Sequence, residues 1–276
     1  MTAPRIRNLV SHSDFKACVE IQKIVWRHSP ENLTPVHQFC MSVETGSILL
    51  GAFVEGRLAG FVYSVPALHR GKFCQHSHLL AVLPEFHGLG LGKRLKWAQR
   101  DKAIALGYDL ITWTYDPLQV RNAGLNLHTL GAEARIYLPN FYGGEASLVF
   151  AETVPSDRLK VEWAIASRRV RDRVGEKYPS YDLGREARAL EGRLTNGRLE
   201  PFPVRWNGSA PRTLVEIPRD LAKHRREPEY IRAWQIALHR VLSRAFGRGR
   251  RLTDFIFGER CFYVLGRAGR AAEKGR

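Results

Sequence analysis

The sequence lacks a hydrophobic run long enough to cross a membrane. Its 276 residues contain no uninterrupted apolar stretch of the roughly 18 residues that a membrane-spanning helix needs. Residues Met1 to Val10 include two arginines, but no hydrophobic region of signal-peptide type follows them. We therefore expect a cytoplasmic protein with no membrane partner, and its 44% of hydrophobic residues are enough to bury a core.

Cysteine is also scarce and shows no paired spacing. The four cysteines are scattered through the chain: Cys18, Cys40, Cys74 and Cys261. This arrangement gives no sign of a disulfide framework or of a zinc site, so we expect reduced core residues and no metal.

Acidic residues are too few to balance the basic ones, and the formal net charge is +16. Most of the excess lies in residues 176–276, where arginines such as Arg225, Arg226 and Arg248 have no aromatic residues interleaved among them. A base-stacking surface normally combines the two residue types. We therefore favour a solvated arginine-rich surface over a polyanion-binding one, which argues against nucleic acid as a partner.

Hydrophobic periodicity predicts alternating helices and strands in the first 170 residues. Strands are expected at Arg5–Val10, Ser47–Val54, Leu58–Val65, Lys72–Leu83, Asp109–Tyr115, Glu133–Leu138 and either Ser147–Glu152 or Lys160–Ile165. Helices are expected from Ser13 or Asp14, over Val36–Val43, over Lys93–Leu106 with Gly107 as a cap, and near Arg121–Gly131.

The pattern changes after a basic helical piece that begins at Arg168. Residues 175–212 are rich in Gly, Pro, Arg and Asn and have weak periodicity, which predicts an irregular segment. A strand, a long helix and a hairpin are expected to follow, at Thr213–Ile217, Glu229–Phe246 and Leu252–Leu265. We accordingly divide the chain into a core of residues 1–170, a linker of 171–212, a small α+β portion of 213–266 and a disordered tail of 267–276.

A glycine-rich loop follows the strand that Pro84 ends. The residues His87 to Gly92 read His-Gly-Leu-Gly-Leu-Gly, and a segment with helical spacing comes next. Glycines allow tight turns with inward N–H groups, and the start of a helix adds the positive end of its dipole. The loop is therefore a candidate cradle for a phosphate or pyrophosphate.

This order of elements resembles the GNAT superfamily of acyl-CoA-dependent N-acyltransferases. The segment Ala81–Gly92 is similar to the family's motif A, whose core is Arg or Gln, two residues, Gly, one residue, then Gly or Ala. Gly90 and Gly92 match its last two positions, whereas His87 replaces the Arg or Gln. The resemblance implies an α+β fold with a mixed, mainly antiparallel sheet flanked by helices, here with an extra C-terminal α+β portion.

A closer resemblance is to a long-chain subgroup of this superfamily. It rests on His76-Ser77-His78, on residues 109–118 (DLITWTYDPL), on Asn140-Phe141-Tyr142-Gly143 and on Glu216-Ile217-Pro218. Members of this subgroup include acetyltransferases of unassigned substrate, and some resemble succinyl-CoA-dependent N-succinyltransferases of D-amino acids. The resemblance covers nearly the whole chain.

The resemblance implies a coenzyme A site around the glycine loop. The pyrophosphate would lie on Gly88–Lys93, with Lys93 or Arg94 supporting its charge, and the pantetheine would run along Leu80–Val82. The Val82 N–H would act as the oxyanion donor. The expected cofactor-binding residues are Leu80, Ala81, Val82, His87, Gly88, Leu89, Gly90, Leu91, Gly92, Lys93, Arg94, Asn122 and Asn126.

Acyl transfer also needs a base for the amine and an acid for the leaving thiolate. His76 and His78 lie two apart on one strand and so face the same side; they are either catalytic bases or packed histidines. The family's acid, a tyrosine four residues before the glycine that ends the short helix, is replaced here by Leu127. The alternatives are His128, Asn126, Tyr115 or no dedicated acid.

Charged residues near the strand ends are candidates for acceptor binding. Asp116 either binds an ammonium group or caps the following turn. Arg121 and Arg135 either pair with a carboxylate of the substrate or form surface ion pairs. Aromatic side chains are candidates for lining the acceptor pocket, or else belong to the core: Trp26, Trp113, Tyr137, Phe141 and Tyr142.

We therefore expect an enzyme that transfers an acetyl or succinyl group from acetyl-CoA or succinyl-CoA to the amine of a small molecule. The acceptor is expected to be an amino acid, with D-amino acid N-succinyltransferase as the sharpest form of the prediction. The alternative is a non-catalytic protein of the same fold that binds acyl-CoA or docks a partner. Residues 176–276 either complete the pocket or mediate a homodimer.

Overall fold

The computed structural model describes residues 3–26, 30–143, 154–224 and 226–267. The predicted strand Ser147–Glu152 and residues 268–276 of the predicted tail therefore lie outside the described residues. The chain forms two compact units. Unit 1 comprises Met1–Trp113 with Trp163–Arg171, and unit 2 comprises Thr114–Glu162 with Asp172–Arg276.

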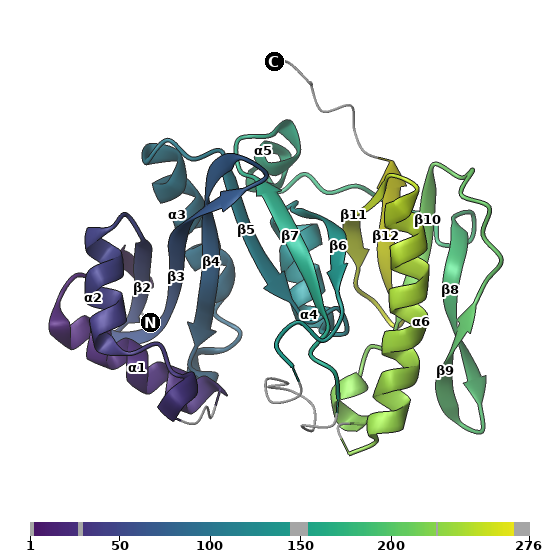
Figure 1. Ribbon diagram of the computed structural model, residues 1–276, viewed down its shortest axis with the longest axis horizontal. Coiled ribbons are helices and arrows are strands. Elements are labelled where there is room, and N and C mark those ends of the chain that lie inside the picture. Colours follow the sequence, from purple (N-terminus) through teal and green to yellow (C-terminus); the bar gives the residue numbers. More distant parts are fainter. Residues whose placement is uncertain (1–2, 27–29, 144–153, 225, 268–276) are drawn as a thin grey trace. The chain divides into compact units, whose positions relative to one another are not determined.

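Unit 1 contains a mixed, mainly antiparallel sheet with helices (Figure 1). Its strands are adjacent in chain order: β1 (Arg5–Asn8), β2 (Ile48–Val54), β3 (Arg57–His69), β4 (Lys72–Val82) and β5 (Leu110–Tyr115), the last of which continues into unit 2. Its principal helices are α1 (His12–Trp26), α2 (Val36–Glu44) and α3 (Leu91–Ala105). Each of these elements was predicted, and the α+β class is confirmed.

Helix α1 begins with a reciprocal cap at Ser11. The Ser11 hydroxyl accepts the Asp14 N–H at 3.1 Å, and the Asp14 carboxylate accepts the Ser11 N–H at 3.2 Å. Arg7 adds two further hydrogen bonds to Asp14, which hold the pKa of that carboxyl well below its usual range. The cap was predicted at Ser13 or Asp14, whereas the N-cap is Ser11 and Asp14 closes the capping box from the third helical position.

The β2–β3 hairpin confirms the turn that the sequence predicts. Glu55 and Gly56 both have positive φ, at 50° and 81°. Two successive residues of this kind match the right-handed twist of paired strands.

The two faces of the unit 1 sheet are covered differently. On one face, Phe61 and Tyr63 of β3 pack with Phe15 of α1 and Phe39 of α2 in a hydrophobic cluster. Ser77 of β4 pairs with Ser64, whose side chain points to the opposite face from that of Tyr63. Helix α3 covers this second face, as its contacts with Ser77 show.

Lys96 of α3 is buried between helix and sheet, and it forms no ion pair with a carboxylate in the part of the chain that the structure describes. Its Nζ donates to Ser77 Oγ at 3.1 Å and to Gln99 Oε1 at 2.6 Å, and it lies 3.9 Å from the centre of the Trp113 ring. Burial lowers the pKa of Lys96 to about 7, while the tryptophan ring favours the charged form.

The strands of unit 2 follow the order β7-β6-β11-β12-β10-β8-β9. The strands are β6 (Glu133–Leu138), β7 (Arg158–Ala164, which extends into unit 1), β8 (Ala187–Thr195), β9 (Arg198–Pro203), β10 (Arg212–Ile217), β11 (Arg250–Ile256) and β12 (Cys261–Arg267). The helical elements of unit 2 include α4 (Val120–Ala123), the π-helical turn η3 (Gly124–Thr129) and α6 (Pro228–Gly247). A further helix, α5 (Arg168–Val174), begins in unit 1 and ends in unit 2.

Two paired strands lie in the segment that we predicted to be an irregular linker. β8 pairs antiparallel with β9 and parallel with β10, so the prediction is wrong for this part of residues 171–212. The pattern was hidden because Gly192 interrupts β8 and because β9 contains Pro201 and Pro203. Proline cannot donate to a strand ladder, and β9 tolerates it as the last strand of the sheet.

The C-terminal strands join the same sheet as β6. Leu252 of β11 pairs with Ala134 of β6, so the predicted separate portion of residues 213–266 shares its sheet with residues 133–138. Arg267, the first residue of the predicted tail, is the last residue of β12. Sequence periodicity located these strands correctly but could not show which strand each one would pair with.

A fully buried carboxylate, that of Asp254, connects several parts of unit 2. Its Oδ1 accepts His128 Nδ1–H at 3.0 Å and the Phe255 N–H at 2.8 Å. Its Oδ2 accepts Arg173 Nη2–H at 3.0 Å and the Tyr181 hydroxyl at 2.8 Å. Each oxygen therefore has two donors, and Arg173 balances the charge.

No helix among the described residues is both long and apolar enough to cross a lipid bilayer.

Replacing Lys96 by Met should change how stability depends on pH. The folded state holds Lys96 with a pKa of about 7, against 10.5 for an exposed lysine, so between these values the unfolded chain binds more protons. The free energy of unfolding of the parent protein should therefore rise with pH across this window, by at most about 1.4 kcal/mol per pH unit. Lys96→Met should lose this slope in urea titrations at pH 6 to 10. Lys102→Met, an exposed lysine of the same helix, is the control, and an equal slope in Lys96→Met would contradict the prediction.

Replacing Asp254 by Ala should destabilise unit 2 severely. The change leaves Arg173 buried without its partner, a loss of about 3–5 kcal/mol for a broken buried ion pair. Urea unfolding followed by tryptophan fluorescence measures the effect. Lys223→Ala, which removes an exposed ion pair with Asp220, should leave unfolding nearly unchanged. Equal small effects in both variants would show that Asp254 is not a structural centre.

Candidate functional site

The C-terminal half of β4 has one edge that is not paired with β5. β4 and β5 run parallel and pair at Gln75 with Ile111 and at His76 with Thr112. Within the described chain this pairing does not continue from Ser77 to Val82, whereas β3 pairs with β4 as far as Val82. The strand therefore presents a free backbone edge over the residues that we expect to hold pantetheine.

The backbone N–H groups of Leu80 and Val82 point toward this free edge. The Leu83 N–H donates to Ala59 O of the β3 side at 2.9 Å, and N–H directions alternate along a strand. Val82 and Leu80 consequently direct their N–H groups away from β3, and Ala81 directs its own toward β3. This is the orientation that an oxyanion donor at Val82 requires.

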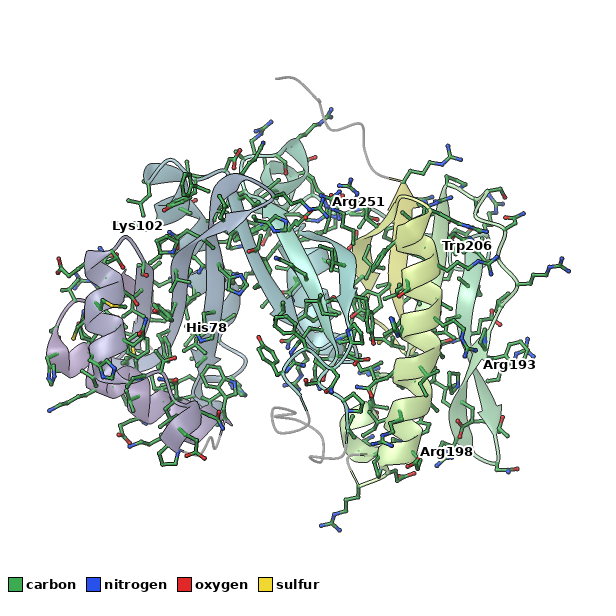
Figure 2. The ribbon with its side chains drawn as sticks, viewed as in Figure 1. His78, Lys102, Arg193, Arg198, Trp206 and Arg251 are labelled. Carbon is green, nitrogen blue, oxygen red and sulfur yellow. The ribbon has the colours of Figure 1, made fainter. Side chains whose placement is uncertain are left out.

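An extra residue in β4 precedes this edge. Tyr63 pairs with Leu79 and Ser64 pairs with Ser77, so His78 is inserted between two ladder positions as a β-bulge. The His78 ring lies edge-on to Tyr63 with centroids 6.1 Å apart, which places it on the face that also carries His76. Figure 2 shows His78 on β4.

The two histidines have different surroundings. His76 is partly buried, and its Nδ1 lies 3.1 Å from Thr112 Oγ1. The His78 side chain retains solvent contact, and desolvation by the protein around it lowers its pKa. A lowered pKa favours the neutral imidazole that can accept a proton.

The glycine loop leads directly into α3. Gly88 and Gly90 have φ of 86° and 69°, a conformation that favours glycine, and Gly90 is the N-cap of α3. The first backbone hydrogen bond of the helix runs from Arg94 N to Gly90 O at 3.1 Å. The N–H groups of Leu91, Gly92 and Lys93 therefore precede the helical ladder, as in other anion-binding helix starts.

The space in front of the loop is open. A Cβ added at Gly88, Gly90 or Gly92 would meet no atom within 4 Å. Leu89 is exposed, whereas Leu91 is buried and anchors the first turn of α3. The loop therefore offers backbone N–H groups, a helix N-terminus and room for an anion.

His87, which replaces the motif's Arg or Gln, holds the loop against β4. Its Nε2–H donates to Val82 O at 3.0 Å. Lys93 lies partly buried in the first turn, while exposed Arg94 donates to Pro4 O at 2.7 Å. Arg94 is thus engaged with the N-terminal segment, while both side chains belong to the first turn of α3, directly behind the loop.

Leu127, at the place of the family's catalytic tyrosine, is fully buried in η3. The hydroxyl of Tyr115, one alternative acid, donates to Tyr263 inside unit 2. His128 donates to Asp254, and Asn126 is buried. Asn122, on α4, is exposed. The Tyr115 hydroxyl is therefore used in a core hydrogen bond, and His128 Nδ1 is used in a hydrogen bond to Asp254. These contacts identify no residue that would replace the family's catalytic tyrosine as the general acid.

Asp116 lies directly after β5 and caps the next turn. Its Oδ1 accepts the Leu118 N–H at 2.9 Å, which is one of the two roles expected for it. Desolvation, opposed by this hydrogen bond and by Arg158, raises the pKa of Asp116 to about 6. Asp116 as a residue is only partly buried.

The aromatic candidates divide into core and accessible residues. Trp26 packs against the core cluster of unit 1, and Trp113 is buried beside Lys96. Tyr137 is buried, donates to Asp157 Oδ2 at 2.5 Å and stacks on His239 with centroids 4.6 Å apart. Phe141 and Tyr142 are exposed, so these two remain as rim candidates.

One of the two arginines predicted to bind a carboxylate is already in an ion pair. Arg135 forms an ion pair with Glu162, with Nε 3.0 Å from Oε2, which was the alternative expected for it. Arg121 is exposed on α4. Sequence reasoning missed Arg158, whose guanidinium lies over the Tyr142 ring at 5.1 Å. The sequence feature that could have identified Arg158 is its position beside Asp157 at the start of a strand. Its contact with Tyr142, however, cannot be predicted from residue spacing.

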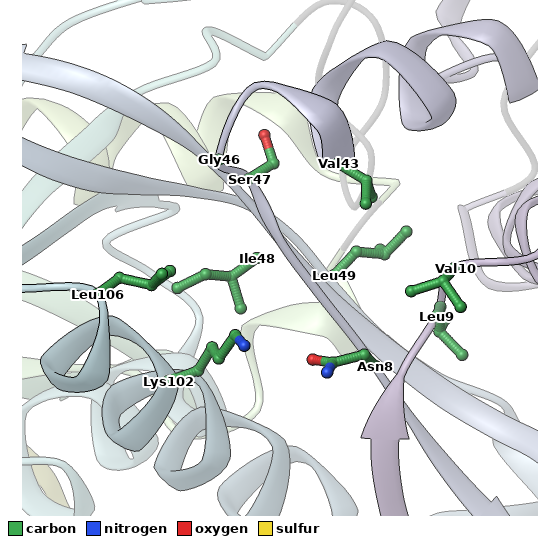
Figure 3. Close-up of a pocket in the computed structure, with 10 residues that line it drawn as sticks. All are labelled: Asn8, Leu9, Val10, Val43, Gly46, Ser47, Ile48, Leu49, Lys102 and Leu106. Atoms are coloured by element: carbon green, nitrogen blue, oxygen red, sulfur yellow. The ribbon is translucent and has the colours of Figure 1, made fainter.

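A pocket of about 260 Å³ lies elsewhere in unit 1 (Figure 3). Its lining includes Asn8, Ile48, Lys102 and Leu106. Lys102 and Leu106 mark the C-terminal end of α3, whereas the glycine loop precedes its N-terminal end. The pocket is therefore separate from the glycine loop.

Arginines of unit 2 stack on aromatic rings that are not interleaved with them in the sequence. Arg193 lies 3.2 Å from the centre of the Phe202 ring, and Arg198 lies 4.7 Å from that of Tyr230 (Figure 2). The rings belong to other strands and helices, so the pairs are invisible in the linear pattern. The stacks are intramolecular and by themselves assign no partner.

No group of three or more potential metal-ligating side chains occurs among the residues that the structure describes.

Three solved structures illustrate what the chain is similar to. The ribosomal-protein-S18-alanine N-acetyltransferase of Escherichia coli is 15% identical, with a TM-score of 0.47, over 59% of this chain and 95% of that chain. The Salmonella typhimurium protein yncA, solved with its cofactor acetyl-CoA, is 15% identical, with a TM-score of 0.48, over 66% and 99%. The IAA acetyltransferase of Bacillus cereus is 14% identical, with a TM-score of 0.44, over 58% and 97%.

A search of curated proteins gives no match to this chain. The model of the acetyltransferase (GNAT) family matches residues 14–131, a range that contains β4, the glycine loop and α3. With that match, and with the α+β fold already described, residues 14–131 form a domain of the GNAT superfamily of N-acyltransferases.

Proposed function

We propose that the protein transfers an acetyl or succinyl group from acetyl-CoA or succinyl-CoA to the amine of a small acceptor, an amino acid. The observation that carries the proposal is the free edge of β4, which leads into the glycine loop. One continuous backbone surface there can hold an extended pantetheine and then an anionic pyrophosphate. The resemblance to D-amino acid N-succinyltransferases makes a D-amino acid with a succinyl donor the sharpest form of the proposal.

Backbone groups of unit 1 would bind the acyl donor. The N–H groups of Leu80 and Val82 would pair with the pantetheine amides and with the thioester carbonyl. A preorganised oxyanion donor of the kind assigned to Val82 contributes about 2.7–4 kcal/mol in enzymes where it has been removed. The loop from Gly88 to Lys93 would hold the pyrophosphate, and His87 would keep that loop aligned with the end of β4.

Proton transfer would begin at β4. His78 is the better candidate for the base, because its ring keeps solvent contact and its pKa is lowered, whereas His76 is partly buried beside Thr112. The neutral acceptor amine would attack the thioester carbon, the tetrahedral oxyanion would form at the Val82 N–H, and the thiolate would then leave. Solvent would supply the proton to the thiolate, because Leu127 stands where the family has its acid.

A second candidate function follows from the leucine at position 127. A buried leucine in place of the acid suits a protein of the same fold that binds acyl-CoA without turnover. The two candidates share the coenzyme A site and differ in release of free thiol.

Turnover is the direct test of the proposed function. Incubation with acetyl-CoA or succinyl-CoA and a panel of D- and L-amino acids should release coenzyme A, detected with a thiol reagent. His78→Ala should lower kcat by about 100-fold or more with the KM for acyl-CoA little changed, since a general base contributes that much. Tight acyl-CoA binding without thiol release across the panel would support the non-catalytic alternative instead.

Gly92→Glu should abolish coenzyme A binding without straining the backbone. Gly92 lies in the first turn of α3, has no positive φ and has open space around its Cβ, so the fold can accept the side chain. The carboxylate would face the pyrophosphate, and like charges brought together cost several kcal/mol, so calorimetry should show a loss of about 100-fold or more in affinity.

Gly247→Glu is the matched control for Gly92→Glu. Gly247 also lies in a helix, at the end of α6, with no atom within 4 Å of an added Cβ. Its affinity for coenzyme A should equal that of the parent. Unchanged affinity in Gly92→Glu would disprove the assignment of the glycine loop.

A further inference from the structure

Unit 2 holds an acidic and a basic side chain close together at two strand ends. Asp116 follows β5, and Arg158 is the first residue of β7. Tyr142 links the two strand ends, because the Arg158 guanidinium lies over its ring at 5.1 Å and its hydroxyl is 3.3 Å from Thr114 Oγ1, two residues before Asp116. The charge of Arg158 also lowers the pKa of Asp116. No hydrogen bond joins them among the described residues, and each therefore keeps capacity for a ligand.

Hydrogen bonds hold the Asp116 carboxylate in place but do not occupy all of its acceptor sites. The Leu118 N–H holds Oδ1, and the Gln119 side chain provides a further hydrogen bond. The residue is only partly buried. A carboxylate has about four acceptor sites, so it can still accept from an ammonium group.

The Arg158 guanidinium is held by two contacts that leave most of its donors free. Nη1–H donates to Asp157 O at 3.1 Å, and the group lies over the Tyr142 ring at 5.1 Å. The Tyr142 hydroxyl is itself 3.3 Å from Thr114 Oγ1. Within the described chain the other N–H groups of Arg158 have no acceptor, and a guanidinium in a fixed plane is suited to a carboxylate.

Asp157, the second carboxylate nearby, is already satisfied. Its Oδ2 accepts the Tyr137 hydroxyl and its Oδ1 accepts the Asn140 N–H at 2.9 Å, and it is nearly buried. It therefore neither neutralises Arg158 through a side-chain hydrogen bond nor offers a free oxygen to a ligand. Asp116 and Arg158 remain as the pair with unused capacity.

We propose that Asp116 and Arg158 bind the acceptor as a zwitterion, with its ammonium group at Asp116 and its carboxylate at Arg158. This inference rests on the proposed N-acyltransferase function and assigns its specificity. The acceptor class is free amino acids, and amines without a carboxylate are poor acceptors. Arg158 takes the role that the sequence suggested for Arg121 or Arg135.

The test compares amino acids with the amines that remain when their carboxylates are removed. The pairs are alanine with ethylamine, phenylalanine with phenethylamine and lysine with cadaverine, with both enantiomers of each amino acid. The parent protein should prefer the amino acid in kcat/KM by about tenfold or more, as expected for charge-assisted hydrogen bonds to one carboxylate. Arg158→Met should reduce this preference to near one by slowing only the amino acid, and Arg158→Lys should restore part of it.

Asp116→Asn should slow the amino acid and the amine of each pair alike, because both carry the ammonium group. Arg219→Met is the matched control, since Arg219 also donates from Nη1 to one backbone carbonyl, at 3.1 Å, and lies 5.2 Å from one aromatic ring. It should keep the parent's preference. Equal rates for amino acid and amine in the parent, or equal losses for both in Arg158→Met, would overturn the proposal.

A binding measurement separates this proposal from the proposed function. If the parent releases no thiol with any acceptor, the N-acyltransferase function fails. Calorimetry with the same amino acids then tests the zwitterion site on its own. Binding that Arg158→Met and Asp116→Asn each abolish would retain the site, and absence of binding in the parent would overturn it.

Discussion

Backbone hydrogen bonding between β3 and β4 positions the backbone groups of β4 that would bind the acyl donor. The β3–β4 ladder continues to the end of β4, while pairing with β5 occurs at Gln75 and His76. The alternation of a strand then directs the Leu80 and Val82 N–H groups to the open edge. Gly60 permits this geometry, because a Cβ there would lie 2.5 Å from Ala81 O. Pro84 and the glycine loop carry the chain from this edge into α3.

Buried charges in the two units are stabilised in different ways. Asp254 is surrounded by four donors, one of them the guanidinium of Arg173, so its charge is matched. Lys96 has two neutral acceptors and a tryptophan face, so its charge is only partly compensated and its pKa falls. A buried carboxylate with an ion partner has its charge compensated, whereas a buried lysine whose pKa falls makes stability depend on pH.

The site was predictable where its chemistry comes from the backbone. Gly88 and Gly90 have positive φ, and α3 starts directly behind them. Because both properties depend on neighbouring residues only, the spacing of the glycines was enough to predict the loop. The acceptor residues were predicted less well. Arg135 was proposed for a carboxylate but is paired with Glu162, and Arg158 was missed. An arginine's partner depends on which strands lie beside it, and periodicity carries no information about that neighbour.

The α+β class, most strand and helix positions and the glycine loop follow from the sequence alone, because turn chemistry and hydrophobic periodicity act over a few residues. The pairing of β8 with β9, the pairing of β11 with β6 and the bulge at His78 became visible with the fold. The same holds for the position of the Arg158 guanidinium over the Tyr142 ring. These features depend on strand pairing and side-chain packing between distant segments, whose free energies are set by contacts that a linear pattern does not contain.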